Sequence, residues 1–116
     1  MIRLSIPFPP STNRIWRSVG TRVLLSREGR AYRQRVAEAV MVARVQGFGR
    51  KKLALVIDAS MPDARRRDLD NLLKAAQDAM QAARLYEDDS QIVDLRIRHA
   101  GIDRANPRLD VMLEAA

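Results

Sequence analysis

The sequence predicts an α+β fold, with one mixed β-sheet and two helices packed on it in the order β-β-α-β-α-β-β. Two observations carry this prediction. In several short segments apolar residues alternate with polar ones, which is the pattern of strands with one buried face. In two longer segments apolar residues recur every three or four positions, as in amphipathic helices. The 116 residues are expected to form a single domain over 1–116.

The first half of the chain should hold two strands and one helix. The expected elements are a strand over 2–8, a loop over 11–20, a short strand over 22–25, and a helix from a cap at Ser26 to a stop at Gly47. Three prolines around positions 7–10 end the first strand, because proline cannot donate to a sheet. Serine is a favoured helix cap, and glycine commonly ends helices.

The second half should hold three strands and one helix. The expected elements are a strand over 53–61, a polar loop over 62–67, a helix over 69–83, and strands over 92–98 and 109–113. Segment 53–61 is apolar nearly throughout, so we expect a central strand with both faces covered.

The charge of the chain is unevenly distributed. Its 21 Lys and Arg residues, of which 18 are Arg, outnumber 14 Asp and Glu and give a net charge of +7. Residues 1–52 carry +10 and residues 53–116 carry −3. A basic half that is rich in Arg suits a polyanionic partner such as nucleic acid, because the guanidinium binds phosphate with two hydrogen bonds. The alternative is a solvated Arg-rich surface without a partner.

Composition excludes several classes of protein. A hydrophobic fraction of 47% with 30% charged residues is typical of globular domains and not of disordered chains. No apolar run approaches the ~18 residues of a membrane span, and the proline-broken start does not resemble a signal peptide. Cysteine is absent, which excludes disulfides and thiolate metal sites and fits a cytoplasmic protein.

Two acidic groups flank the second predicted helix. Asp68 and Asp70 follow three consecutive arginines at the expected start of the helix, and Lys74 shares a helix face with Asp70. Asp68 and Asp70 can converge if Asp68 still belongs to the extended segment. A second group, 87–89, precedes the next strand and could reach the first pair if that strand runs beside 53–61. Carboxylates grouped in this way suit Mg²⁺ and metal-assisted phosphodiester hydrolysis, with the lysine stabilising charge in the transition state.

Structural explanations exist for each of these residues. Asp68 or Asp70 can be a simple helix cap, and Asp88 and Asp89 can be solvated loop residues. Lys74 can be an ion-pair partner of Asp70 or Asp78. The pattern alone leaves both interpretations open. Trp16 can stack on an opened base or anchor its loop, Phe48 can be a wedge or an anchor, and His99 is given no role.

These segments resemble a known family. The stretches MPDARRRDLDNLLKAAQDAM and EDDSQIVD, the opening PPSTNR and the segment SREGRAYR are similar to the RusA family of Holliday-junction resolvases, also called crossover junction endodeoxyribonucleases. The resemblance covers nearly the whole chain in order. One departure is Ala64, at a place where relatives can carry another basic residue.

The resemblance implies a homodimeric, Mg²⁺-dependent endonuclease, with Mn²⁺ as a substitute, that cuts four-way DNA junctions by paired symmetric nicks in recombination and repair. No nucleotide cofactor and no membrane are implied, and the source would be bacterial or phage-encoded. By motif, the metal-binding catalytic carboxylates are Asp68, Asp70 and Asp89, with Lys74 as the catalytic lysine and Asp88 in support. The expected phosphate contacts are Arg14, Arg17, Arg65, Arg66 and Arg67.

Two rival functions stay open at this point. One is a non-catalytic basic DNA-binding protein, such as a phage regulator, and the other is a metal nuclease that acts on other branched DNA. A pure binding protein has no reason to place carboxylates beside its arginines, because without a metal they would repel phosphate.

Overall fold

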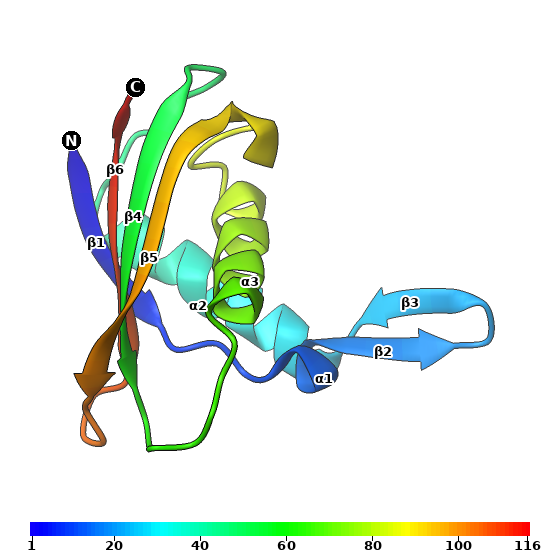
Figure 1. Ribbon diagram of the computed structural model, residues 1–116. Helices are drawn as coiled ribbons and strands as arrows, with labels where there is room; N and C mark the ends of the chain where they lie inside the picture. Colours follow the sequence, from blue (N-terminus) through cyan, green and yellow to red (C-terminus); the bar gives the residue numbers. More distant parts are fainter.

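A four-stranded mixed sheet with two long helices on one face forms the body of the protein in a computed structural model that describes residues 1–116 (Figure 1). The sheet has the strand order β1-β6-β4-β5. Its strands are β1 (Ile2–Pro7), β4 (Leu53–Met61), β5 (Ile92–Ile102) and β6 (Arg108–Ala115). The helices are α2 (Arg27–Val42) and α3 (Leu69–Ala82). The predicted α+β class is therefore confirmed.

The core lies between the sheet and the two helices. Leu55, Ile57 and Val111 from the sheet and Val36 and Ala76 from the helices are all at most 1% exposed. The face of the sheet away from the helices is more open, and Ala54, Val56 and Asp58 of β4 are only half-buried there. Strand β4 is central in the sheet, but the expectation that both its faces are covered was wrong, because both helices lie on the same side.

The strands around β4 run in different directions. Strand β6 pairs with β4 and β1 antiparallel, whereas β5 pairs with β4 parallel, in a register from Leu53↔Ile92 to Met61↔Ile102. A parallel pair needs a crossover connection, and α3 provides it. The starts of β4 and β5 therefore lie at one end of the sheet, and the loop that leaves β4 toward α3 lies at the other.

Residues 11–25 differ from the prediction. They form a one-turn helix α1 (Thr12–Ile15) and a hairpin of β2 (Trp16–Val19) and β3 (Arg22–Leu25), separate from the main sheet. The hairpin projects from the body of the molecule (Figure 1). The predicted strand over 22–25 exists, but it pairs with a strand inside the predicted loop and not with the main sheet.

Both long helices end without glycine. After α2 the chain turns at Arg44, which has a left-handed φ of 54°, and after α3 it turns at Arg84, with φ 64°. Each end is a Schellman motif, in which the next residue donates to a carbonyl five positions back, as Val45 does to Val40. Helix α2 therefore ends at Val42, and the predicted stop at Gly47 was too late.

A short 3₁₀ helix, η1 (Asp89–Gln91), leads into β5. Asp88 caps it by accepting from the backbone N–H of Ser90, and the side chain of Gln91 accepts from the backbone N–H of Asp88. The amide of Gln91 also donates to the carbonyls of Gly49 and Lys51, which ties η1 to the segment before β4. None of the helices is both long and apolar enough to span a membrane.

Candidate active site

A groove of about 520 Å³ brings together two segments that are far apart in the sequence. One wall is the proline-rich segment that follows β1, and the other is the loop between β4 and α3. Its lining residues are Phe8, Pro9, Pro10, Ser11, Thr12, Asn13, Arg14, Pro62, Arg65, Arg66, Arg67, Asp68, Asn71 and Leu72. The sequence motifs PPSTNR and ARRRD thus meet in one place, and Asp68 lies in the wall beside the arginines.

Asp68 is the N-cap of α3 and keeps its carboxylate free. Its backbone is extended, with φ −80° and ψ 126°, and its side chain makes no capping hydrogen bond. The structural alternative, in which this aspartate serves only to cap the helix, is therefore not what the structure shows. The extended backbone is also the condition under which Asp68 and Asp70 can converge. Asp70 is exposed in the first turn of α3, where the helix dipole favours a carboxylate.

Lys74 lies one turn after Asp70 on the same helix. It is exposed, and none of the six ion pairs in the structure involves it. Its ammonium group is therefore available to a phosphate near the carboxylates and is not committed to Asp70 as an ion-pair partner.

Asp89 has an unusual environment at the start of η1. It is half-buried, and its Oδ1 atom is buried without a hydrogen-bond partner. The neighbouring Tyr86 hydroxyl donates to the carbonyl of Gln77 at 2.9 Å. Burial raises the pKa of the Asp89 carboxyl above its usual value, the nearby Tyr86 hydroxyl partly offsets this, and the negative charges of Asp78 and Asp88 raise the pKa further. An acceptor without a donor in a buried position is costly, so this oxygen suits a cation.

The structure does not bring Asp89 to the other two carboxylates within one chain. Asp89 lies near Asp78 at the end of α3, whereas Asp68 and Asp70 lie at its start. Asp70 and Asp78 are eight residues apart, or roughly 12 Å along a helix axis. No group of three His, Cys, Asp or Glu side chains in the chain is close enough to hold a metal ion. Strand β5 does run beside β4, as supposed, but its parallel direction places η1 at the opposite end from the loop before α3.

The donor chemistry nonetheless fits Mg²⁺. The free carboxylate of Asp68, the exposed carboxylate of Asp70 and the unpartnered Oδ1 of Asp89 are the hard oxygen ligands that Mg²⁺ prefers. Within one chain, Asp68 and Asp70 lie at the start of α3, and Asp89 lies apart from them near its other end.

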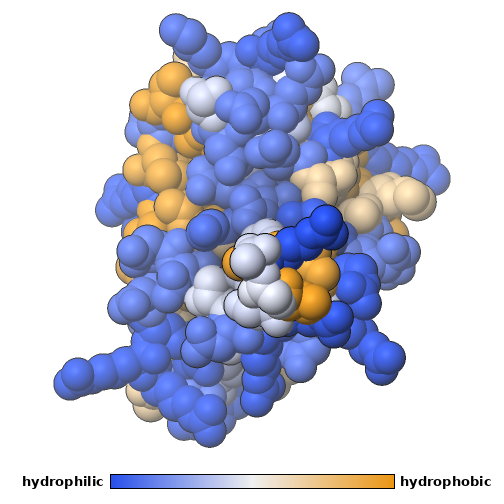
Figure 2. All heavy atoms as spheres, turned by 90° about the vertical axis from the view of Figure 1, so that its right-hand side faces the viewer, coloured by the Kyte–Doolittle hydropathy of each residue, from blue (hydrophilic) through white to orange (hydrophobic).

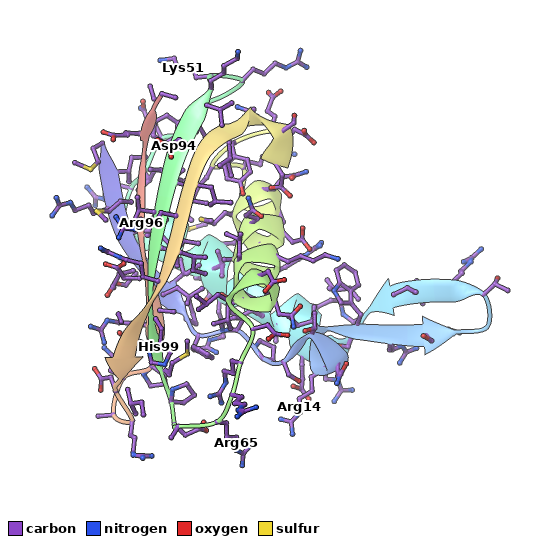
Figure 3. All side chains as sticks on the ribbon, in the orientation of Figure 1. Arg14, Lys51, Arg65, Asp94, Arg96 and His99 are labelled. Carbon is purple, nitrogen blue, oxygen red and sulfur yellow. The ribbon has the colours of Figure 1, made fainter.

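The five candidate arginines have different surroundings. Arg14 and Arg65 point outward from neighbouring segments at the same end of the molecule (Figure 3). Arg66 also lines the groove and is exposed. Arg17 lies on β2 of the projecting hairpin, outside the groove. Arg67 is only 23% exposed, because its guanidinium is bound to Asp63.

The structure shows the surroundings of the two side chains whose roles the sequence left open, Trp16 and Phe48, and of His99, which was given no role. Trp16 is half-buried at the base of the hairpin, and Phe48 packs against the core while its N–H donates to the carbonyl of Leu85. Phe48 is thus an anchor in this structure. His99 is exposed on β5 and accepts from the N–H of Gly101.

Sequence reasoning overlooked Phe8 and Asp63. Phe8 lines the groove and lies under Arg67, with the guanidinium carbon 5.4 Å from the ring centroid. Asp63 binds Arg67 through both carboxylate oxygens. A signal was present, since Asp63 and Arg67 are four residues apart with opposite charges.

A family model and several known proteins match this chain, and all of them belong to the same family. The family model for endodeoxyribonuclease RusA matches residues 7–114. The chain belongs to the RusA family. It is 44% identical over 94 residues to the crossover junction endodeoxyribonuclease RusA of Escherichia coli, which covers 81% of this chain and 78% of that protein. The RusA protein of Shigella sonnei is 43% identical and that of Enterobacteria phage 82 is 42% identical, with the same coverage. RusA proteins are endonucleases that hydrolyse phosphodiester bonds in DNA.

Proposed function

We propose that this chain is a Mg²⁺-dependent, structure-selective endodeoxyribonuclease that resolves four-way DNA junctions by paired symmetric nicks. Family membership supports the reaction class, and the names of the relatives, crossover junction endodeoxyribonucleases, support junction DNA as substrate. The observation that carries the proposal is the groove, in which exposed arginines flank a free carboxylate at the start of α3. Basic groups beside a potential metal ligand suit phosphodiester cleavage better than simple DNA binding.

Each candidate residue has a role in this proposal. Asp68, Asp70 and Asp89 hold Mg²⁺, with Mn²⁺ as a substitute, and Asp88 supports Asp89 by capping η1. Mg²⁺ bound by these carboxylates would supply a Lewis acid for water activation and positive charge beside the scissile phosphate. Lys74 adds positive charge for the transition state. The phosphate contacts come from the exposed arginines Arg14, Arg17, Arg65 and Arg66, whereas Arg67, the fifth candidate, is bound to Asp63 in this structure.

A homodimer is part of the proposal, and the placement of the carboxylates supports it. A two-fold axis that sets the α3 helices of two copies antiparallel would bring the Asp68 end of one copy to the Asp89 end of the other. The two sites so formed are equivalent, which matches the paired strands of a four-way junction. The free edge of β5 beside α3 is a suitable contact surface, because Val93 and Leu95 are 55% and 44% exposed there.

Cleavage assays test the reaction. We expect the purified protein to cut a mobile four-way junction symmetrically with Mg²⁺, and to leave a matched linear duplex uncut. EDTA should abolish cleavage, and Asp70→Asn should lower the rate by at least about 100-fold while it retains junction binding. Glu114→Gln, which removes an exposed carboxylate at the far end of β6, is the matched control and should cut normally.

Other outcomes would favour the rival functions. Junction binding without any cleavage would favour a non-catalytic DNA-binding protein. Equal cutting of flaps or nicked duplex would favour a nuclease for other branched DNA. Full activity in EDTA would overturn the metal mechanism.

Mixing two inactive variants tests the shared site. In a dimer of one Asp70→Asn chain and one Asp89→Asn chain, a site shared between copies leaves one site intact and the other doubly damaged. We therefore expect the mixture to regain nicking of one strand, whereas each variant alone stays inactive. If each site were built from a single chain, both sites would be damaged and the mixture would stay inactive.

The proposed activity places the protein with its DNA substrate in the cytoplasm of a bacterium, whether host- or phage-encoded. The proposal needs no nucleotide cofactor and no membrane.

A further inference from the structure

The loop between β4 and α3 is closed by its own ion pair. The carboxylate of Asp63 binds the guanidinium of Arg67 through two hydrogen bonds, of 2.7 Å to Oδ1 and 3.2 Å to Oδ2. The same Oδ1 accepts the backbone N–H of Arg65 at 2.9 Å. One side chain therefore fixes two other points of the six-residue segment that leads to Asp68.

Arg67 also joins this loop to the first strand. Its guanidinium carbon lies 5.4 Å from the ring centroid of Phe8, the residue after β1. Its side chain is 23% exposed, compared with 84% for Arg65 in the same loop. Most of Arg67 is thus covered by protein, which distinguishes it from the neighbouring arginines.

The residue after Arg67 is Asp68. Its carboxylate has no hydrogen bond to the helix end that it caps, so its direction depends on the backbone that leads to it. We propose that Asp63 is a positioning residue, which holds Arg67 on Phe8 and thereby fixes the backbone that presents the Asp68 carboxylate. This inference rests on the proposed function, in which Asp68 binds Mg²⁺.

The energetics support a structural role for this pair. Isolated surface ion pairs contribute little, but two-point pairs between Arg and carboxylate are stronger and fix geometry. The hydrogen bonds from Arg67 and from the backbone of Arg65 lower the pKa of Asp63 to about 2. The carboxylate is therefore charged at any pH used for cleavage.

Charge alone would make Asp63 unfavourable beside a DNA groove. A carboxylate near phosphates weakens binding, so its removal should strengthen DNA binding if it has no other role. A positioning role predicts a different result, because loss of the pair leaves Asp68 misplaced and slows cleavage. Loss of the charge should tighten DNA binding, whereas loss of positioning should slow cleavage. Binding and cleavage can be measured separately.

The experiment compares Asp63→Asn with wild type in single-turnover cleavage of a four-way junction. We expect the maximal rate to fall by about ten-fold or more, since small misplacements of reacting groups have effects of this size. The Mg²⁺ concentration for half-maximal rate should rise, and junction binding in EDTA should be unchanged or tighter. Phe8→Leu, which removes the stacking surface under Arg67 and keeps an apolar side chain against the core, should change the rate and the Mg²⁺ dependence in the same direction.

Asp58→Asn is the matched control. This substitution breaks the ion pair between Asp58 and Arg98 on the open face of the sheet. That pair is also made by two hydrogen bonds, of 2.6 and 2.8 Å. We expect it to leave the rate and the Mg²⁺ dependence unchanged. Thermal unfolding of each variant verifies that the protein is folded.

Two outcomes would overturn the inference. One is a wild-type rate and Mg²⁺ dependence in Asp63→Asn. The other is weaker junction binding with an unchanged rate at saturating DNA, which would mean that Asp63 acts on DNA contact and not on Asp68. The variant Asp68→Asn distinguishes a failure of this inference from a failure of the proposed function. If Asp68→Asn cuts normally, the proposed function of Asp68 as a metal ligand is wrong.

Discussion

Arg65 and Arg66 differ from Arg67 in what their guanidinium groups can bind. The first two are exposed in the wall of the groove, whereas Arg67 is held by Asp63 over Phe8. The three consecutive arginines thus divide into two exposed ones, of which Arg65 also lies 4.0 Å from Asp63, and one, Arg67, that is held by two hydrogen bonds. The sequence alone predicts the same role for all three, because it does not show which neighbour each side chain meets.

Arg65→Ala should weaken junction binding through the loss of a phosphate contact. We expect the slope of log affinity against log salt concentration to decrease in magnitude by about 1. Arg3→Ala is the control, since Arg3 is exposed on β1, at the edge of the sheet opposite β5. The measurement is a salt titration of binding in EDTA. An unchanged slope in Arg65→Ala would show that this arginine does not contact phosphate.

Asp63 should also be detectable in the acid stability of the protein. Its pKa is lowered to about 2 in the folded state, compared with about 3.9 for an unperturbed carboxyl. Its contribution to stability is therefore fully present above about pH 5 and is lost as the pH falls through 2 toward about 1. Thermal unfolding should show wild type more stable than Asp63→Asn at pH 5, with a difference that has become small at pH 2. A difference that is constant over this range would contradict the pKa.

At the scale of elements, the end of α2 was predicted wrongly, whereas α3 ends at Ala82, one residue before the predicted end at 83. Glycine is the usual residue at a left-handed position after a helix, and the sequence offered Gly47. The structure uses Arg44 and Arg84 instead, with Val45 and Leu85 completing each motif. Packing of these apolar residues fixes the helix ends, and packing partners cannot be identified from local sequence.

Arg44→Gly should stabilise the fold. A left-handed backbone costs a non-glycine residue roughly 1–2 kcal/mol, part of which is offset by the greater freedom of glycine in the unfolded chain. We expect the free energy of unfolding to rise by up to about 1 kcal/mol in chemical denaturation. Ala43→Gly is the control: this residue has a right-handed helical backbone, so glycine should destabilise it. Destabilisation by Arg44→Gly would show that its side chain makes a contribution larger than the strain.

The hairpin shows another limit of prediction at this scale. Residues 16–25 lack a long alternating pattern, and Val19 and Val23 remain 45% and 66% exposed. Viewed from the hairpin side, the surface is largely hydrophilic with small apolar areas (Figure 2). Strands that do not bury a face leave little signal in the sequence, whereas β4 and β6 were predicted well because their inner faces are fully buried.

At the scale of the whole molecule, the fold class could be predicted but the topology could not. Periodicity identifies strands and helices, but the parallel pairing of β4 with β5 is decided by the crossover through α3. That direction controls the candidate site, since it places Asp89 at the opposite end of α3 from Asp68 and Asp70. The residue types of the site could therefore be predicted from the sequence, while their separation within one chain could not.

Leu95→Glu should disrupt the proposed dimer. Leu95 is in register with the buried Leu55, yet it is 44% exposed because β5 is the edge of the sheet. We expect sedimentation to show a shift to monomer and junction cleavage to be lost, with the fold retained. Val42→Glu, at an 82% exposed position on α2, is the control and should remain dimeric and active. A monomeric Leu95→Glu protein with full cleavage activity would contradict the shared site.

The position of β6 has a consequence for biosynthesis. This strand lies between β1 and β4, so it joins the N-terminal strand to the rest of the sheet, although it is the last of the four strands to be translated. Until β6 is made, β1 lacks the one strand with which it pairs, although Tyr32 of α2 donates to the carbonyl of Pro7 at the end of β1. The sheet that contains β1 and β4 can therefore be completed only after β6 has been translated.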